Sequence, residues 1–230
     1  MAALNYLNNQ FDNMTIKRLP LMVKLTNDHI AKLQAQQSDA DILPLLQRIE
    51  PLHNAFIAAN IAFIVAKGNR KGRTLALTQL LQELSKKKIK QWDIQIQSVY
   101  LEGESRYTML LPNRRSPFQQ GAYDERIAEV NALAQRLQAE PSLAATKADV
   151  DAYYLRLITA RDLQQQEEGR MAQQNDLANQ ARKALAIMMF GNMGALMDKY
   201  RAQPQFVATF WETALLKQHR KPKKDQSESI

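Results

Sequence analysis

The stretch between Tyr123 and Tyr200 constrains the fold more than any other part of the chain. It holds about one third of the sequence, consists almost entirely of helix-forming residues and contains one proline, Pro141. Glycine and proline interrupt helices, whereas Ala, Leu and Gln favour them, and the 230 residues include only 7 glycines and 8 prolines. The sequence therefore predicts an all-α protein, a bundle of about five to seven helices with long antiparallel members.

Apolar residues at helical spacing predict where several helices lie. The clearest stripe alternates steps of four and three residues and consists of Leu45, Ile49, Leu52, Phe56, Ala59 and Phe63. A later stripe changes phase, because the step from Leu84 to Ile89 is five residues, and this predicts a kink or two helices meeting at the lysines between them. We expect one helical domain over residues 1–216 and a basic, polar, disordered tail over residues 217–230.

Three segments are expected to depart from regular helix. Residues 67–73 combine two glycines with four basic residues, a composition that predicts a loop. Residues 112–121 are expected to form a connection without secondary structure, the longest in the chain apart from the tail. Residues 164–176 contain a single large apolar side chain, so a helix there either projects beyond the bundle or breaks at Gly169.

The sequence offers no constellation for catalysis. The absence of cysteine removes thiolate nucleophiles, iron–sulfur ligation and most structural zinc sites. His53 follows Glu50 at the spacing used by di-metal helix bundles, but neither of the other two histidines has a glutamate at that spacing, which favours ordinary packing. Gly68 and Gly72 have the wrong spacing for a phosphate-binding loop. We predict no catalytic residue, no metal and no cofactor, and hence a protein that is not an enzyme.

The sequence also favours a cytoplasmic protein without a membrane span. Its first residues lack the basic start and apolar stretch of a secretory signal. The most apolar window, residues 55–66, is shorter than the roughly 20 residues that cross a bilayer as a helix. Residence in the cytoplasm, or in a particle assembled there, is the expectation.

Positive charge is concentrated rather than spread along the chain. The formal net charge is +8, and residues 67–90 carry eight basic residues against Glu83 alone, a balance of +7. The connection at 112–121 adds two arginines and an aromatic side chain that can anchor it. The candidate partner-binding residues are Lys67, Arg70, Lys71, Arg73, Lys86, Lys87, Lys88, Lys90, Arg114, Arg115 and Phe118.

These observations favour a non-catalytic structural or assembly protein. We expect it to form homo-oligomers, or to bind other protein subunits, through apolar helix faces, and to present its basic surfaces to an acidic partner. The alternative is a nucleic-acid-binding helical protein that uses residues 67–90 and the basic tail, although few aromatic residues are interleaved to stack on bases. A helical enzyme acting on a phosphorylated substrate comes third. Each basic group also has an ordinary interpretation as a solvated face, and Phe118 as a residue that pins a connection to the bundle.

Overall fold

The fold is built from helices, as predicted. A computed structural model describes residues 9–12, 19–212 and 215, and no strand occurs among them. The all-α, multi-helix fold class is therefore confirmed. The principal elements are α1 (Leu19–Gln34), α2 (Leu43–Glu83), the π-helical turn η3 (Leu84–Lys88), α3 (Ile89–Gln97), α4 (Ser105–Leu110), α5 (Ser116–Gln119), α6 (Tyr123–Arg136), η4 (Leu137–Ala139), η5 (Pro141–Leu143), α7 (Ala144–Lys199), α8 (Pro204–Val207) and η6 (Ala208–Phe210).

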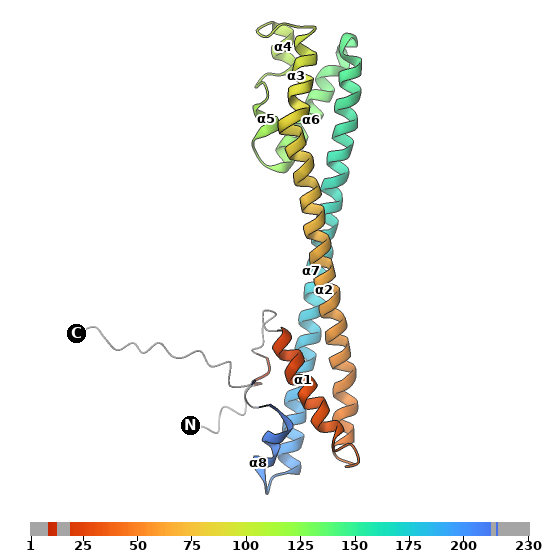
Figure 1. The fold of residues 1–230 in the computed structure, drawn as a ribbon, viewed down its shortest axis with the longest axis vertical. Helices are drawn as coiled ribbons and strands as arrows, with labels where there is room; N and C mark the ends of the chain where they lie inside the picture. The colour runs from red at the N-terminus through yellow and green to blue at the C-terminus, as the bar shows by residue number, and fades with distance from the viewer. Residues whose placement is uncertain (1–8, 13–18, 213–214, 216–230) are drawn as a thin grey trace, which may run out of the picture. The chain divides into compact units, whose positions relative to one another are not determined.

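The chain divides into two compact units. Unit 1 comprises residues 1–64 and 173–230, and unit 2 comprises residues 65–172. Helices α2 and α7 contribute residues to both units (Figure 1). A single domain over residues 1–216 stays a prediction, and the predicted tail at 217–230 lies outside the described residues.

Unit 1 buries the first part of the predicted stripe of α2 against α1 and the end of α7, whereas Ala59 and Phe63 at the end of the stripe belong to neither core. Leu45, Ile49 and Phe56 are at most 5% exposed, and they share a core with Leu25 of α1 and Leu185 of α7. The short segment α8–η6 adds its own aromatic residues to that core. They are Phe210 and the adjacent Trp211, which packs beside Phe11.

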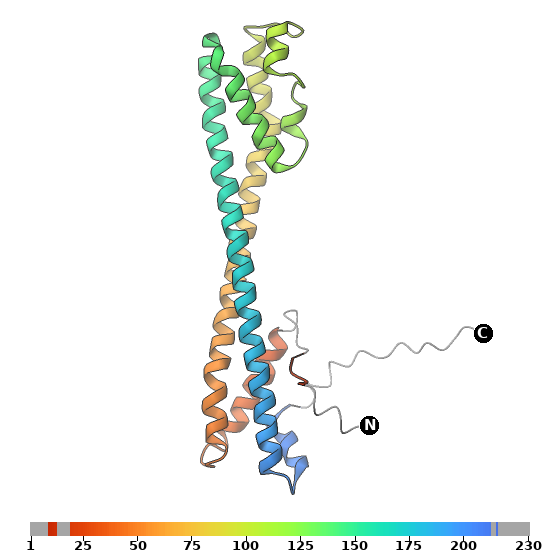
Figure 2. The same cartoon turned by 180° about the vertical axis from the view of Figure 1, so that it is seen from behind.

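Unit 2 places α3, α4, α5 and α6 around the neighbouring parts of α2 and α7 (Figures 1 and 2). Its core contains Leu81 of α2, Trp92 of α3, Phe118 of α5 and Val130 of α6. Three ion pairs join α2 and η3, the first limb of this unit, to α7, its second limb. They are Arg70 with Glu168 at 3.5 Å, Glu83 with Arg156 at 3.5 Å, and Lys88 with Asp149 at 2.8 Å. Residue numbers rise on one limb as they fall on the other, so the two run antiparallel, as predicted.

The predicted loop at residues 67–73 is wrong, because α2 runs through this segment without interruption. Lys and Arg are good helix formers, and extending an existing helix costs far less than starting a new one. Gly68 and Gly72 do not require a turn, since neither is among the residues with positive φ. The charged composition indicated solvent exposure, which the structure shows, but not an end to the helix.

The phase change between Leu84 and Ile89 takes the form of the π-helical turn η3. The backbone N–H of Ile89 donates to the carbonyl of Leu84, five residues earlier, as a π-turn requires. The extra residue returns Ile89 and Trp92 to the buried side of α3, where both are 0% exposed. The sequence located this irregularity correctly.

Two other segments are more helical than their composition indicated. The predicted structureless connection at 112–121 contains α5, so that prediction is wrong in part. Helix α7 continues through Gly169, so the alternative of a break at this glycine is wrong.

Candidate interaction site

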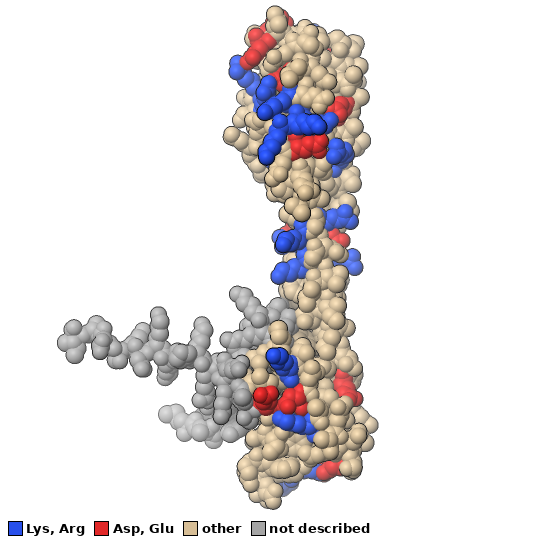
Figure 3. Space-filling model, viewed as in Figure 1, with Lys and Arg blue, Asp and Glu red and all other residues tan. Residues whose placement is uncertain are grey.

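Six of the candidate basic residues carry charges that no acidic side chain balances. Within the described part of the chain none of the six forms an ion pair, and each is exposed. They are Lys67, Lys71 and Arg73 on α2, Lys86 and Lys87 on η3, and Lys90 on α3. Figure 3 shows Lys and Arg side chains gathered over the part of unit 2 that contains α3 and α5, with a few acidic side chains among them. This surface is suited to an acidic partner.

The other candidate cations are each matched by a carboxylate. Arg70 pairs with Glu168 and Lys88 with Asp149. In the connection after α4, Arg114 Nη2 lies 2.7 Å from Glu102 Oε1, and Arg115 Nε donates to Asp93 Oδ2. Their charges therefore contribute less to a positive field than the sequence suggested.

Phe118 does not lie at the surface. Its side chain is 1% exposed and belongs to the core of unit 2. It pins the connection onto the helices, which was the alternative interpretation, and in this conformation it offers no contact to a partner.

The π-turn is held by polar side chains from three other helices. Tyr153 of α7 donates its hydroxyl to the carbonyl of Leu80 at 2.7 Å, and Gln119 of α5 donates to the carbonyl of Ser85 at 3.1 Å. Arg126 of α6 donates to the carbonyl of Leu81 and, at 3.0 Å, to that of Phe118. A π-turn disturbs the regular backbone ladder of a helix, and these donors occupy carbonyls next to it. These hydrogen bonds therefore hold in place the π-turn that carries Lys86 and Lys87.

Lys88 faces the interior side of the turn instead of the solvent. Its ammonium group lies 2.8 Å from Asp149 Oδ1, and the indole N–H of Trp92 donates to Asp149 Oδ2 at 2.7 Å. Partial burial raises the pKa of Asp149, but the hydrogen bonds from Lys88 and Trp92 outweigh it and hold the pKa below its usual range. This trio joins η3 and α3 to α7.

A polar pocket of about 500 Å³ lies beside Arg115. Its floor includes the Asp93 carboxylate, which is 2% exposed and accepts hydrogen bonds from Tyr107 and Gln97 as well as from Arg115. Burial, together with the hydrogen bond to Asp93, raises the pKa of Tyr107. The wall is polar too: Asn113, Arg114, Ser116, Gln119 and Gln120 also line the pocket. Neutral donors and two arginines line this pocket together with the carboxylates of Asp93 and Glu102, and such a lining suits a small polar group.

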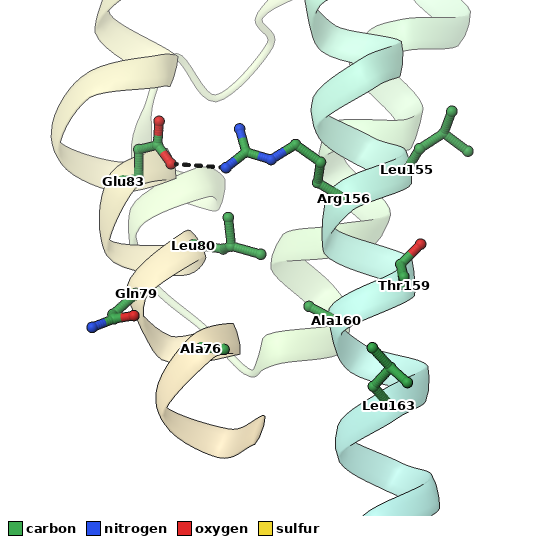
Figure 4. Close-up of a pocket in the computed structure, with 9 residues that line it drawn as sticks. All are labelled: Ala76, Gln79, Leu80, Glu83, Leu155, Arg156, Thr159, Ala160 and Leu163. Atoms are coloured by element: carbon green, nitrogen blue, oxygen red, sulfur yellow. Dashed lines mark ion pairs between the residues drawn. The ribbon is translucent and has the colours of Figure 1, made fainter. Parts of the chain in front are cut away.

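An apolar groove of about 680 Å³ lies between the unit 2 parts of α2 and α7. Figure 4 shows Leu80 of α2 and Ala160 and Leu163 of α7 directed into the space between the helices. Arg156 reaches across one end toward Glu83, whereas Leu155 points away from the gap. Leu155 is also one of the residues that line the groove and is 58% exposed, so the groove is open to solvent on that side.

The histidines have structural surroundings. His53 is 6% exposed, and its Nδ1 has no hydrogen-bond partner in the described structure. Burial lowers its pKa. No group of three or more potential metal ligands occurs among the described residues. His29, which no sequence pattern singled out, is buried between α7 and the segment that ends in Trp211.

One helical stretch is long and apolar enough to cross a membrane, judged by length and composition alone. It runs from residue 43 to residue 97. Its most apolar window of 18 residues has a mean hydropathy of 1.4, and 22% of the residues in that window are buried. The same criteria are met by core helices of other proteins, so the predicted absence of a membrane span stays a prediction.

Sequence reasoning missed both the apolar groove and the buried carboxylate of Asp93. The groove had a signal, because Ala76, Leu80 and Glu83 repeat at helical spacing, as do Arg156, Ala160 and Leu163. That second stripe was hidden by the stronger core stripe next to it. No sequence pattern marks Asp93, because the sequence does not distinguish a buried aspartate from a solvent-exposed one.

Comparison of the chain with protein-family models, with curated proteins and with solved structures gave no match.

Proposed function

We propose that this chain is a non-catalytic assembly protein that associates with copies of itself through apolar helix faces and presents a basic surface to an acidic partner. The observation that carries the proposal is the open apolar groove of unit 2, with the exposed apolar side chains beside it. Apolar surface of this kind gains free energy when a second molecule covers it, about 25 cal/mol for each Å² removed from water. Surfaces that expose such patches are commonly interaction sites.

Exposed apolar residues outside the groove support the same proposal. Val65 and Leu75, on the unit 2 part of α2, are 55% and 58% exposed. Ile61 and Ile64 of unit 1 are also exposed. Large aliphatic side chains at these positions contribute nothing to the core of either unit, since neither core includes them. A partner that covers them explains their presence on the surface of α2.

Sedimentation velocity over a wide range of protein concentration tests the proposal. The wild-type chain is expected to shift to a larger sedimentation coefficient as concentration rises. Leu155→Glu, which places a charge beside the groove at an exposed position, should remove the shift. Ile94→Glu is the matched control, because Ile94 is exposed on α3 and does not line the groove. A wild-type protein that stays monomeric throughout contradicts the proposal.

Nucleic-acid binding is the second candidate, and the six unbalanced cations of residues 67–90 favour it. A phosphate backbone bound by these residues would release counterions, so affinity should fall steeply as salt increases. Filter binding with DNA and RNA at two salt concentrations measures this. Replacement of Lys86, Lys87 and Lys90 by glutamine should weaken binding and flatten its salt dependence. Binding that is unchanged in this variant would exclude the lysines as its site.

A further inference from the structure

The pocket around Arg115 supports a ligand of more definite chemistry than an acidic surface. We propose that it binds the phosphate group of a phosphate monoester, with Arg115 as the central donor, while Lys86 and Lys90, which lie outside the pocket lining, add positive charge nearby. This inference rests on the part of the proposed function that gives unit 2 an acidic partner. It does not depend on self-association.

Arg115 is oriented by a buried carboxylate. Asp93 Oδ1 accepts hydrogen bonds from the Tyr107 hydroxyl at 2.8 Å and from Gln97 Nε2 at 3.1 Å, and Asp93 Oδ2 accepts one from Arg115 Nε. Because Asp93 is held from three sides, it fixes the guanidinium plane. The two terminal nitrogens of Arg115 have no acceptor among the described residues. Their planar fork is therefore available, and such a fork matches two oxygens of a phosphate.

Neutral donors complete the wall of the pocket. The side chains of Asn113, Ser116 and Gln120 line it and form no hydrogen bond with the rest of the described chain. Arg114, whose φ of 51° makes it the only non-glycine residue with positive φ in the described structure, also lies on this wall. Unusual backbone conformations are concentrated at binding sites, and here the conformation belongs to the residue that precedes Arg115.

Helical register adds positive charge to the same side of α3. Lys90 precedes Asp93 by three residues on α3, so the two are neighbours on the surface of this helix, and Lys86 lies on the π-turn that leads into it. Both lysines are exposed, and neither forms an ion pair with any described residue. The Arg114 charge is compensated by Glu102.

The balance of these charges selects the ligand class. The residues that line the pocket sum to zero charge, because Arg114 and Arg115 balance Glu102 and Asp93, and Lys86 and Lys90 outside the lining bring the total to +2. A phosphate monoester carries a charge of about −1.5 to −2 at pH 7, whereas a carboxylate carries one negative charge. The pocket volume of about 500 Å³ exceeds what a phosphate ion occupies, so the organic part of the ester is expected to contribute to binding.

Isothermal titration calorimetry on the full chain tests the site with phenyl phosphate, inorganic phosphate and benzoate as probes. We expect saturable binding of phenyl phosphate at one site, weaker binding of inorganic phosphate and the weakest binding of benzoate. Arg115→Lys keeps a cation for Asp93 but loses the fork, and it should weaken phenyl phosphate binding about tenfold or more. Lys90→Met, at an exposed position, should weaken binding without affecting the fold. Lys67→Met, on α2 and outside the pocket, is the matched control and should bind as the wild type does.

Absence of saturable phenyl phosphate binding by the wild-type chain overturns the proposal. Equal affinity of the wild type, Arg115→Lys and Lys90→Met overturns it as well, because the ligand then binds elsewhere. Circular dichroism identifies a variant that fails to fold, and Lys90→Met still decides the question if Arg115→Lys is such a variant. Sedimentation of the same samples separates the two hypotheses, since phosphate binding and self-association are expected to fail independently.

Discussion

Acidification should destabilise unit 1 through His29. Its ring is 0% exposed and is stacked on Trp211 with a centroid distance of 4.3 Å. Nδ1 lies 3.0 Å from the Phe210 carbonyl, which can only accept, so this nitrogen carries the hydrogen. Nε2 accepts from the Asn192 amide at 3.2 Å. A second proton on the ring would place two donors opposite each other at Nε2.

The magnitude follows from the pKa of His29. Burial lowers this pKa from 6.5 to about 4, against the smaller raising effects of the Phe210 hydrogen bond and the Asp28 charge. The difference, 6.5 − 4, is 2.5 pH units, and each unit corresponds to 1.36 kcal/mol. The stabilisation is complete above pH 6.5. It is lost as the pH falls toward 4, because the unfolded chain takes up the proton first. The loss from His29 alone is about 3 kcal/mol.

Urea denaturation of wild type and His29→Gln at several pH values measures this loss. Trp92→Phe in both backgrounds leaves Trp211 as the fluorescent reporter of unit 1, because the chain has 2 tryptophans. Titration of His53 and of the carboxylates cancels in the comparison. The stability advantage of the wild type should shrink by about 3 kcal/mol between pH 7 and pH 4. An advantage that does not change with pH would refute the argument.

Three further predictions concern unit 2 and the helix that enters it. Arg126→Met removes the side-chain donor to the Phe118 carbonyl and one of the donors to the Leu81 carbonyl, which keeps its hydrogen bond from Ser85 Oγ. This change should cost about 1 to 3 kcal/mol in urea denaturation, whereas Arg73→Met, at an exposed position without an ion pair among the described residues, should cost less than about 1 kcal/mol. Gly68→Ala and Gly72→Ala should each stabilise α2 by about 0.5 to 1 kcal/mol, because no atom lies within 4 Å of the added Cβ; destabilisation would contradict a continuous helix. Deletion of Lys87 should convert the π-turn into regular helix and leave a cooperative thermal unfolding transition, whereas deletion of Gln79 rotates the stripe beyond it by about 100° and should abolish that transition.

The sequence predicted those parts of the fold that depend on periodic burial. Leu45, Ile49 and Phe56 of the predicted stripe lie in a core as expected, whereas Ala59 and Phe63 do not. The five-residue step before Ile89 marked the π-turn. Residues 67–73 were predicted as a loop because glycines and charged residues are common in loops. Helix continuation overrides both when helix already extends on either side.

The candidate site was predictable as a set of cations but not as an arrangement. Sequence alone identified Lys86, Lys90 and Arg115, whose charges are visible in the composition. It could not show that Asp93 is buried and directs Arg115, because this contact joins residues 22 positions apart across a chain reversal. Nor could it separate Lys88, which pairs with Asp149, from its two exposed neighbours.

Self-association through the unit 2 groove is the central claim, and the rate of thiol labelling at the groove tests it most directly. The chain has no cysteine, so Gln79→Cys provides a single reactive group among the residues that line the groove. Gln91→Cys, at an exposed position on α3, serves as the control. Maleimide labelling of Gln79→Cys should slow markedly as protein concentration rises, while labelling of Gln91→Cys stays constant. A Gln79→Cys labelling rate that does not change with protein concentration would contradict the account.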